Sequence, residues 1–423
     1  MIFQLAMALL TVQSPTPSAV RTYRQGSYLY IESSHDRDTL RVAIDKAWGG
    51  AIVAVTLDTN QFINSWDAGR EIQIAMYDGF DSYDGCGGCK GVAGWNPTQA
   101  GDRYRHGSAV IQDSLARDHI YVRTVPVDWF PDNKGGGAQD PVRSDILMEQ
   151  WISVSKYDWR VIHIHYRVTN LGKVAHGNTI QELPSVYVQP EYSRFVYYAG
   201  TAPWTSAAVV DTVLPVAPAP LPTLHMPERW AALVNPTGVG ITVYVPEQYP
   251  YGGGRRIVGA GKPKNWNSVY YRPLVYSSLL PHQVLDEDVF VIPGPYPVAR
   301  AILTSLRDSL RTADGTAPFG RVDSPKANAT VAGSMQVTGW ALDNDCVDRV
   351  DVFIDGMRLG SAEYGVSRPD LQTPYVGAPP GAGFRYTLDT RKVANGPHTI
   401  RVQIVDRSGN VALLKDISVL VKN

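Results

Sequence analysis

Charged residues and long apolar runs are both scarce in this chain of 423 residues. Lys and Arg number 39 and Asp and Glu number 40, which gives a formal net charge of -1. The sequence therefore lacks the basic excess that binding to nucleic acid requires. It also lacks a run of about 18 apolar residues, so no membrane span is predicted. The hydrophobic share of 44% suffices for a large core and argues against disorder.

Cysteine is also rare, with three residues in the whole chain. Cys86 and Cys89 lie close together in a Gly-rich segment, and Cys346 is distant. No second cysteine pair and no histidine follows at the spacing of a zinc site. The βαβ context of a thioredoxin-type redox motif is absent as well. In an oxidising compartment, we expect Cys86 and Cys89 to close a small disulfide loop.

The N-terminus carries a short apolar run, Met1 to Leu10, and then a Pro/Ser/Thr-rich segment that ends in Ser18-Ala19. This order is typical of a secretory signal, although no Lys or Arg precedes the run and Gln4 interrupts it. We interpret residues 1–19 as a candidate signal segment, with a buried N-terminal segment as the alternative. The expected location is secreted or periplasmic.

Short β-branched and aromatic runs, separated by Gly, Pro, Asn or Asp, predict strands along most of the chain. Up to residue 297 the predicted strands are Tyr28–Ile31, Arg41–Ile44, Ile52–Leu57, Ile72–Met76, Ile120–Val125, Ile146–Val154, Arg160–Thr169, Val186–Val188, Ala231–Val234, Ile241–Val245 and Val289–Ile292. One helix is predicted at Val298–Thr312, because Ile302, Leu306 and Leu310 fall on one face. Residues 252–256, with three glycines and two arginines, are interpreted as a flexible basic loop.

The fold class that follows is all-β. A large antiparallel supersandwich is expected over residues 20–297, a connector helix over 298–317, and a smaller sandwich over 318–423. In the last segment the predicted strands are Val350–Ile354, Phe384–Leu388, Thr399–Val405 and Ile417–Val421. Their spacing, with turn signals at Asp355-Gly356 and Asn395-Gly396, is typical of an immunoglobulin-like sandwich.

Two sets of motifs resemble known families. Val337–Asp343 (VTGWALD) and Gly383–Thr390 (GFRYTLDT) resemble the bacterial Ig-like modules appended to secreted proteins. Trp48–Ile52 (WGGAI), Asn64–Arg70 (NSWDAGR) and Tyr166–Gly172 (YRVTNLG) resemble the galactose-mutarotase-like supersandwich. That fold recurs in polysaccharide lyases, sugar epimerases and several glycoside hydrolases, so the second resemblance implies a carbohydrate-active domain. It identifies no family from which catalytic residues can be carried over.

The segment Asp67–Asp78 carries the first candidate site. If it forms a strand, Ile72, Ile74 and Met76 face the core, and the residues between them face the other way. The candidates on that other face are Glu71 and Tyr77 as catalytic residues and Gln73 as a substrate ligand. A carboxylate, an amide and a phenol suit sugar hydroxyls, which need both donors and acceptors. Arg70 is a further substrate ligand, and a structural Asp67–Arg70 pair beside an exposed polar face is the alternative.

The segment Arg160–Val168 alternates in the same way. Its apolar members face inward and leave His163, His165 and Arg167 in a row. Histidine suits acid or base catalysis near neutral pH, and Arg can neutralise a uronate carboxylate. For either histidine alone, a hydrogen-bonded residue on a half-buried face is the alternative.

Further candidates follow in the next strand and in a long loop. Glu182 is the second acid that a glycoside hydrolase would need, and Glu149 is a third. The additional substrate ligands are Trp95, Asn96, Asp102, Gln181 and Tyr187. No cofactor or catalytic metal is predicted. Structural calcium at Asp78, Asp81 and Asp84 is weighed against an ordinary Asp-rich turn.

These patterns predict a secreted carbohydrate-active enzyme that acts on a polysaccharide. Two chemistries stay open at this point. One is glycoside hydrolysis by the paired carboxylates Glu71 and Glu182. The other is a lyase reaction, in which His or Tyr removes the proton beside a uronate carboxylate that Arg neutralises. The alternative function is a non-catalytic carbohydrate-binding or cell-surface protein.

Overall fold

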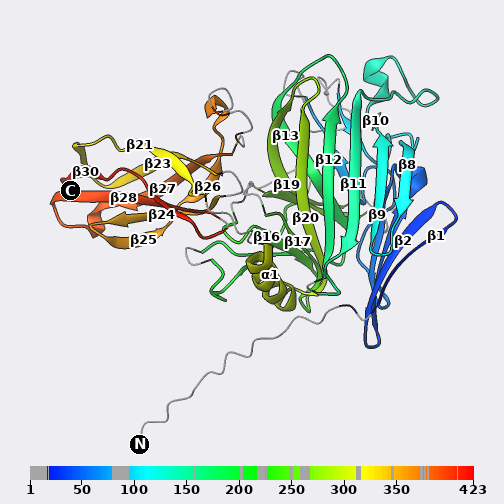
Figure 1. The fold of residues 1–423 in the computed structure, drawn as a ribbon, viewed down its shortest axis with the longest axis horizontal. Coiled ribbons are helices and arrows are strands. Elements are labelled where there is room, and N and C mark those ends of the chain that lie inside the picture. The colour runs from blue at the N-terminus through cyan, green and yellow to red at the C-terminus, as the bar shows by residue number, and fades with distance from the viewer. Residues whose placement is uncertain are drawn as a thin grey trace, which may run out of the picture.

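A computed structural model shows a chain made almost entirely of β-strands, folded into two sandwiches (Figure 1). It describes residues 17, 19–78, 95–156, 158–200, 203–216, 224, 226–246, 251–257, 267–310, 316–343, 347–371, 375, 378, 381–406 and 408–423. The all-β prediction is therefore confirmed. Cys86, Cys89, Cys346, Asp81 and Asp84 lie outside the described residues, as do residues 1–16 and 18 of the candidate signal segment.

The first sheet of the N-terminal sandwich has eleven strands. Its main path runs β1 (Ala19–Gln25), β2 (Tyr28–His35), β3 (Asp38–Asp45), β4 (Ala51–Leu57), β6 (Ile72–Ala75), β13 (His176–Val188), β19 (Ser268–Leu279) and β18 (Tyr251–Arg256). Three short strands pair beside this path, namely β5 (Asn60–Gln61), β7 (Pro97–Thr98) and β10 (Val127–Asp128). The basic loop predicted at 252–256 is wrong, because these residues pair with β19 as the edge strand β18.

The second sheet has nine strands, all antiparallel to their neighbours. Its order is β15 (Val210–Val213), β14 (Arg194–Tyr197), β16 (Trp230–Val234), β17 (Val239–Tyr244), β20 (Val284–Pro295), β12 (Ile162–Asn170), β11 (Ile146–Val154), β9 (His119–Val125) and β8 (Ala109–Leu115). In Figure 1 the strands from β20 to β8 stand side by side in this order.

The core lies between these two sheets and follows the side-chain alternation of their strands. Ile72 and Ile74 of the first sheet belong to one apolar cluster with Ile162, Ile164 and Val168 of the second. All five are fully buried. The residues between them therefore point away from the core, onto the two outer faces of the sandwich. This geometry decides where each candidate residue lies.

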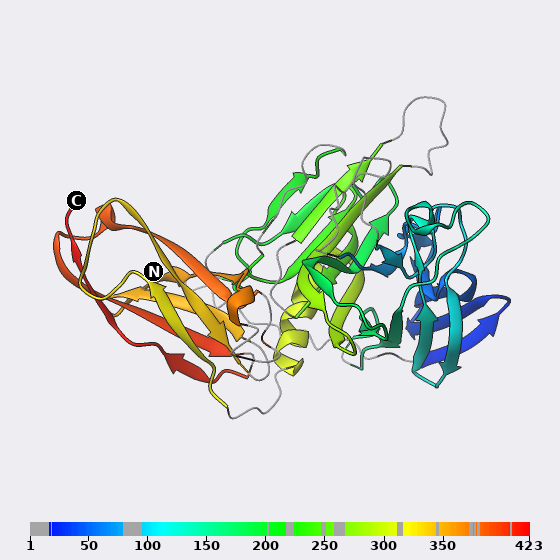
Figure 2. The ribbon, with the colours of Figure 1, turned by 90° about the horizontal axis from the view of Figure 1, so that it is seen from above.

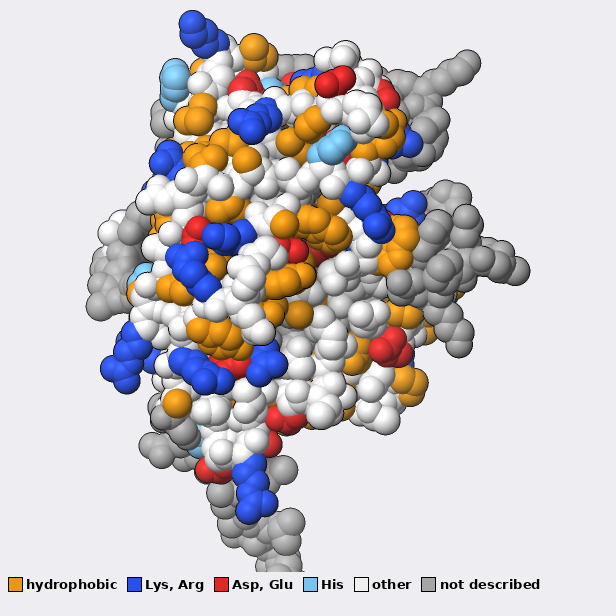
Figure 3. All heavy atoms as spheres, turned by 90° about the vertical axis from the view of Figure 1, so that its right-hand side faces the viewer, with side chains coloured by type: hydrophobic (Ala, Val, Ile, Leu, Met, Phe, Trp, Pro, Cys, Tyr) orange, Lys and Arg blue, Asp and Glu red, His pale blue; other side chains and the backbone are white. Residues whose placement is uncertain are grey.

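Ion pairs join the two sheets at the end that carries β1 and β8. Arg24 of β1 and Lys46 both contact Asp113 of β8, and Thr22 donates a hydrogen bond to the carbonyl of Ala116. Figure 3 views this end, where blue Lys and Arg side chains are interspersed with orange hydrophobic ones. Charged side chains along an edge strand discourage pairing with another sheet.

The single α-helix in the described residues, α1 (Tyr296–Leu310), packs on the outer face of the nine-stranded sheet. Its Leu303 and Leu306 are buried against aromatic residues of β16, β17 and β20. The sequence placed this helix at 298–312, within two residues at each end. Short 3-10 helices occur at Lys46–Trp48, Pro131–Lys134, Pro369–Leu371 and Thr390–Lys392.

The C-terminal sandwich consists of a four-stranded and a six-stranded sheet, and Figure 2 shows it beside the first sandwich. The smaller sheet has β21 (Phe319–Ser324), β23 (Ser334–Leu342), β27 (Gly383–Asp389) and β26 (Glu363–Val366). The larger has β22 (Ala329–Val331), β30 (Ile417–Val421), β28 (Gly396–Asp406), β24 (Val347–Ile354), β25 (Met357–Ser361) and β29 (Val411–Leu413). Only β22 and β30 pair in parallel among these described strands.

Candidate functional site

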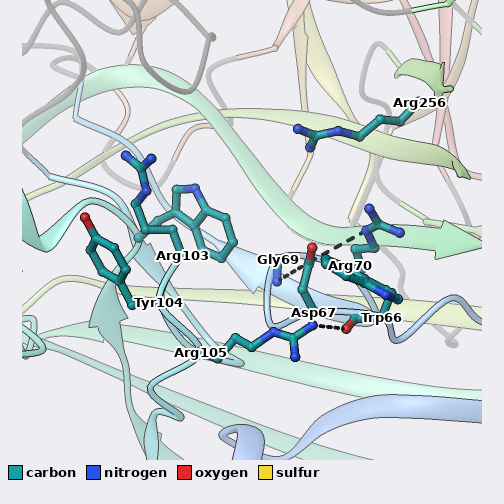
Figure 4. Close-up of a pocket in the computed structure, with 9 residues that line it drawn as sticks. Trp66, Asp67, Gly69, Arg70, Arg103, Tyr104, Arg105 and Arg256 are labelled. Atoms are coloured by element: carbon teal, nitrogen blue, oxygen red, sulfur yellow. Dashed lines mark hydrogen bonds and ion pairs between the residues drawn. The ribbon is translucent and has the colours of Figure 1, made fainter. Parts of the chain in front are cut away.

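The outer face of the eleven-stranded sheet carries a cavity that is lined mainly by arginine and aromatic residues. We call it the arginine cavity, and its volume is about 270 Å³. It is lined by Trp66, Asp67, Gly69, Arg70, Arg103, Tyr104, Arg105, Trp129 and Arg256 (Figure 4). Four arginines thus face one carboxylate, which makes the cavity strongly positive.

Stacking on aromatic rings holds the arginine side chains in place. The Arg105 guanidinium lies 4.7 Å from the centre of the Trp66 ring and donates a hydrogen bond of 3.0 Å to the Trp66 carbonyl. The Arg70 guanidinium lies 5.3 Å from the same ring. Cations over an indole face are attracted by its negative charge density. Trp66 therefore fixes two of the four positive charges.

Arg103 and Arg256 complete the positive lining from other segments. Both are exposed, and Arg256 enters from the end of β18. Within the described part of the chain, neither has a carboxylate within ion-pair distance. Their charge is therefore available to an anionic ligand. Guanidinium groups bind carboxylates and sulfate-like oxyanions through two parallel hydrogen bonds.

The cavity wall requires glycine at position 69. A Cβ atom there would lie 2.5 Å from the Trp129 ring, which is closer than any real contact. Asp67 accepts a hydrogen bond of 3.1 Å from the Gly69 amide and lies 3.6 Å from Arg70 Nε. The Asp67–Arg70 pair weighed in the sequence is thus present, and it forms part of the cavity lining.

Tyr187 lies next to this cavity. Its amide donates to the carbonyl of Glu71, and its carbonyl accepts from Asn64, so its backbone is bound to the loop that carries Trp66 and Arg70. Arg70 interacts electrostatically with Tyr187 and with Arg256. Burial has the largest effect on the pKa of the Arg70 guanidinium, and it lowers that pKa. The Tyr187 ring is half-buried and stacks on Tyr270 of β19 at 5.1 Å.

A second polar group on the same face joins Tyr77, Glu182 and Arg272. The Tyr77 hydroxyl donates a hydrogen bond of 3.1 Å to Glu182, and Arg272 forms an ion pair with the same carboxylate. The alternation of β19, with Val269 and Tyr271 in the core, puts Arg272 on the outer face with Tyr270. The structure thus brings together Tyr77 and Glu182, two of the candidate catalytic residues.

Glu71 does not share this face in the predicted way. Its φ of 64° is left-handed, and β6 begins only at Ile72, so the alternation does not extend to it. Its side chain is fully buried, and neither carboxylate oxygen has a hydrogen-bond partner. Burial raises the pKa of Glu71 well above its usual value. A sealed carboxyl cannot reach a sugar, so the predicted catalytic role of Glu71 needs correction.

Three other predicted residues hold loops and strands together. Gln73 points away from the core, but it bonds the Ala68 carbonyl at 3.2 Å and the Ala100 amide at 2.9 Å. Gln181 joins β13 to Tyr77 through both its amide atoms. Asp102 is fully buried and accepts from His106 Nδ1 at 2.6 Å. These hydrogen bonds occupy the side chains that were expected to bind substrate.

Asn96 lies next to the arginine cavity, because its carbonyl accepts a hydrogen bond of 2.7 Å from the Trp129 amide, and Trp95 precedes it in the chain. Trp95 is buried and stacks on His176 at a ring distance of 3.6 Å. Asn96 is buried too, and its backbone amide donates a hydrogen bond of 2.9 Å to the Asp128 carboxylate. Neither residue lines the arginine cavity.

His163, His165 and Arg167 lie on the outer face of the nine-stranded sheet, away from the arginine cavity. Ile162, Ile164 and Tyr166 point into the core, so the three polar side chains point outward from the opposite sheet. Their partners there are carboxylates of β20. His163 Nε2 and His165 Nδ1 contact Asp288 at 2.7 and 3.1 Å, and Arg167 Nε donates to Asp286 at 2.8 Å. The polar side chains of segments 71–77 and 161–167 therefore belong to different sheets, and His163, His165 and Arg167 do not line the arginine cavity.

Sequence reasoning overlooked the residues that make the cavity positive. Arg103, Tyr104 and Arg105 stand in a loop without strand periodicity, and Arg256 stands in a segment interpreted as a free loop. The signal available was the coincidence of arginines with Trp66 and Trp129 in Gly/Asn-rich segments. Only the fold shows that these segments meet.

No group of three or more potential metal ligands occurs among the described His, Cys, Asp and Glu residues. The described helix is too short and too polar to cross a membrane.

Comparison with solved structures finds distant similarity to carbohydrate-active enzymes. A polysaccharide lyase is 9% identical with a TM-score of 0.37, and the match covers 92% of this chain and 47% of the lyase. Heparan sulfate lyase HepC from Pedobacter heparinus is 8% identical with a TM-score of 0.34, over 76% of this chain and 41% of HepC. The alpha-galactosidase from Lactobacillus brevis is 8% identical with a TM-score of 0.36, and the match covers 64% of this chain and 40% of the galactosidase. The chain spans less than half the length of each.

Comparisons by sequence are informative for the C-terminal sandwich alone. No curated protein matches the chain. Residues 318–402 match the family model of the bacterial Ig domain. With its two packed sheets, the C-terminal sandwich is thus a bacterial Ig-like domain, as the motifs in its sequence predicted.

Proposed function

We propose that this protein binds an acidic polysaccharide on the outer face of the eleven-stranded sheet and cleaves it as a lyase. The observation that carries the proposal is the arginine cavity, where four arginines surround one carboxylate. A uronate carboxylate supplies the missing negative charge, and the rings of Trp66 and Trp129 offer flat apolar surfaces to a sugar. The bacterial Ig-like domain is consistent with a location of the protein outside the cytoplasm.

The lyase reaction assigns roles to Tyr187 and Arg70. Arg70 neutralises the uronate carboxylate, which makes the adjacent C–H bond more acidic. Tyr187, acting as a phenolate, takes that proton. The electron pair of the C–H bond forms a C=C bond as the C–O bond to the next sugar breaks. The departing oxygen then receives the proton from Tyr187, so the enzyme returns to its starting state.

Glycoside hydrolysis by Glu71 and Glu182 has less support. Hydrolysis needs two carboxyl groups on either side of the scissile bond. Glu71 is sealed in the interior, and Glu182 is bound to Arg272 and Tyr77. The arginine-rich lining also suits a charged sugar better than a neutral one.

The test is to incubate the full chain with a panel of polyuronates, sulfated uronate polymers and neutral glucans. Elimination leaves an unsaturated uronate that absorbs ultraviolet light, and hydrolysis leaves none. We expect absorbance to rise with one class of acidic polymer. Reducing ends without absorbance would replace the lyase with a hydrolase. Binding without any product would leave a carbohydrate-binding protein.

A further inference from the structure

A second cavity lies at the end of the sandwich where β6 finishes and β13 begins. Its volume is about 470 Å³, and we call it the end cavity. Asp78, Trp95, Asp145 and His176 contribute to its lining. His176 opens β13 and Tyr187 stands near the close of the same strand. The two cavities share no lining residue, but they are neighbours, because Asp128 lines the end cavity and Trp129, the next residue, lines the arginine cavity.

His176 is the most distinctive residue of the end cavity. Its side chain is only 4% exposed, and it stacks on the buried ring of Trp95. Its Nδ1 lies 2.9 Å from Asp78 Oδ2, and the other oxygen of Asp78 accepts a hydrogen bond of 2.6 Å from the Gly177 amide. The carboxylate is thus fixed, and it holds the imidazole in one orientation with Nδ1 as the donor.

The other ring nitrogen of His176 has no hydrogen-bond partner. Nε2 is buried, and the nearest carboxylate oxygen, Asp145 Oδ1, lies 3.6 Å away. That oxygen already accepts a hydrogen bond of 3.3 Å from Trp95 Nε1. A buried polar atom without a partner is costly, and native proteins satisfy such atoms with a ligand or with water. The cavity provides the space for that partner.

The charges around the end cavity differ in balance from those of the arginine cavity. Three carboxylates, Asp78, Asp128 and Asp145, oppose the two cations Lys134 and Arg143. Asp128 and Lys134 lie 4.0 Å apart and offset each other. Three carboxylates against two cations make this lining less favourable to an acidic sugar than the arginine cavity is, whereas hydroxyl groups can donate to Nε2 and to carboxylate oxygens.

We propose that the end cavity is a second ligand site, which binds an uncharged sugar through a hydroxyl group that donates to His176 Nε2. Asp78 is the positioning residue that keeps Nε2 free to accept. Asp145 accepts a second hydroxyl at the cavity mouth, where its side chain is 37% exposed. The site is separate from the arginine cavity and stands whether or not the lyase proposal holds.

The test is a titration of the full chain, labelled with 15N at its nine histidines, with glucose, glucosamine and glucuronate. The His176 signal is assigned by its absence in His176→Gln. We expect glucose to shift the His176 nitrogen resonances in a saturable way and glucuronate to shift them at least tenfold more weakly. Preference for glucosamine would overturn the uncharged ligand class.

Two variants separate this proposal from the other outcomes. Val174 lines the cavity and is 61% exposed, so Val174→Trp should fold normally and block the response to glucose. Arg256→Gln should leave that response unchanged, even if binding of acidic polymer is lost. No shift of His176 with any of the three sugars would mean that water alone occupies the cavity, and the proposal would fall.

Discussion

At the scale of single residues, Arg256 offers the clearest test of ligand charge. It is exposed and enters the arginine cavity from an edge strand, so its replacement should leave the fold intact. Arg256→Gln removes a charge-assisted hydrogen bond worth about 1.5–3 kcal/mol. We expect the affinity for acidic polysaccharide to fall about tenfold or more, as measured by isothermal titration calorimetry.

The matched control for Arg256 is Arg167→Gln on the opposite sheet. Arg167 has a side chain that is 42% exposed, and it already pairs with Asp286. Its replacement should leave the affinity unchanged if the arginine cavity is the binding site. Equal losses in the two variants would instead indicate non-specific attraction to the whole surface.

Glu71 makes a prediction about pH and stability. Its pKa is raised in the folded state by burial. Its favourable contribution to the free energy of unfolding is therefore complete below the ordinary carboxyl pKa of about 4.3. That contribution is lost as the pH rises through the raised pKa of Glu71 in the folded state. Glu71→Gln cannot ionise, so its free energy of unfolding should fall less steeply with pH above that point.

Urea unfolding of the wild type and of Glu71→Gln across a pH series measures this difference. We expect the variant to gain stability relative to the wild type as the pH rises. Parallel pH profiles would show that Glu71 is ionised in the folded protein. Product formation at neutral pH should persist in the variant, because the carboxyl is sealed from the substrate.

At the scale of elements, helix α1 is anchored by a buried ion pair. Arg300 donates from Nε and Nη2 to Glu228 at 2.9 and 2.6 Å, and Glu228 is fully buried. Trp230 Nε1 and the Trp204 amide each donate to the same carboxylate at 2.7 Å. The helix therefore depends on one acidic residue, which lies in the turn just before β16.

Arg300→Met should leave the Glu228 carboxylate without its cation and lower the free energy of unfolding by about 3–5 kcal/mol. Asp308→Asn on the same helix is the control, since Asp308 is half exposed and pairs only with its neighbour Arg307 among the described residues. It should cost less than about 0.5 kcal/mol. Similar losses in both variants by chemical denaturation would contradict the anchoring role.

The elements also show which parts of the structure could be predicted from the sequence. Periodicity located β11 and β30 at their observed bounds and α1 within two residues, because their buried faces repeat regularly. It failed at Glu71, where a left-handed backbone turn interrupts the alternation. It failed again at Tyr251–Arg256, because three successive glycines have no side chains that could show an alternating pattern. These residues nevertheless form an edge strand, which pairing with β19 stabilises. Both failures lie beside the arginine cavity.

The candidate site was harder to predict, because it depends on contacts between distant segments. Alternation identified the outward side chains of β12 correctly, but it cannot tell which sheet a strand joins. His163 and Tyr187 therefore belong to opposite faces. Arg103 and Arg105 come from a loop without periodicity, so no pattern in the sequence links them to Arg256.

At the scale of the whole molecule, Arg229 connects the two sandwiches. It is 3% exposed and has a left-handed φ of 58°. Its Nη1 donates to the Pro246 carbonyl at 2.6 Å, and its Nη2 donates to Val347 at 2.8 Å and to Asp348. One side chain from the first sandwich thus binds backbone carbonyls of the bacterial Ig-like domain.

Arg229→Ala should loosen this connection and let the Ig-like domain reorient. Small-angle X-ray scattering is expected to show a larger radius of gyration and a broader distance distribution. Arg349→Ala is the control, because Arg349 lies beside Asp348 but is 40% exposed and pairs within its own domain. Unchanged scattering from Arg229→Ala would show that other contacts fix the arrangement.

In the proposed function, the arginine cavity and Tyr187 together carry out elimination on an acidic polysaccharide. The most direct measurement is the rate at which Tyr187→Phe forms unsaturated product, compared with the wild type and with Tyr28→Phe on a distant strand. We expect a loss of kcat of about 100-fold or more for Tyr187→Phe with KM preserved, and full activity for Tyr28→Phe. Wild-type turnover by Tyr187→Phe would contradict it.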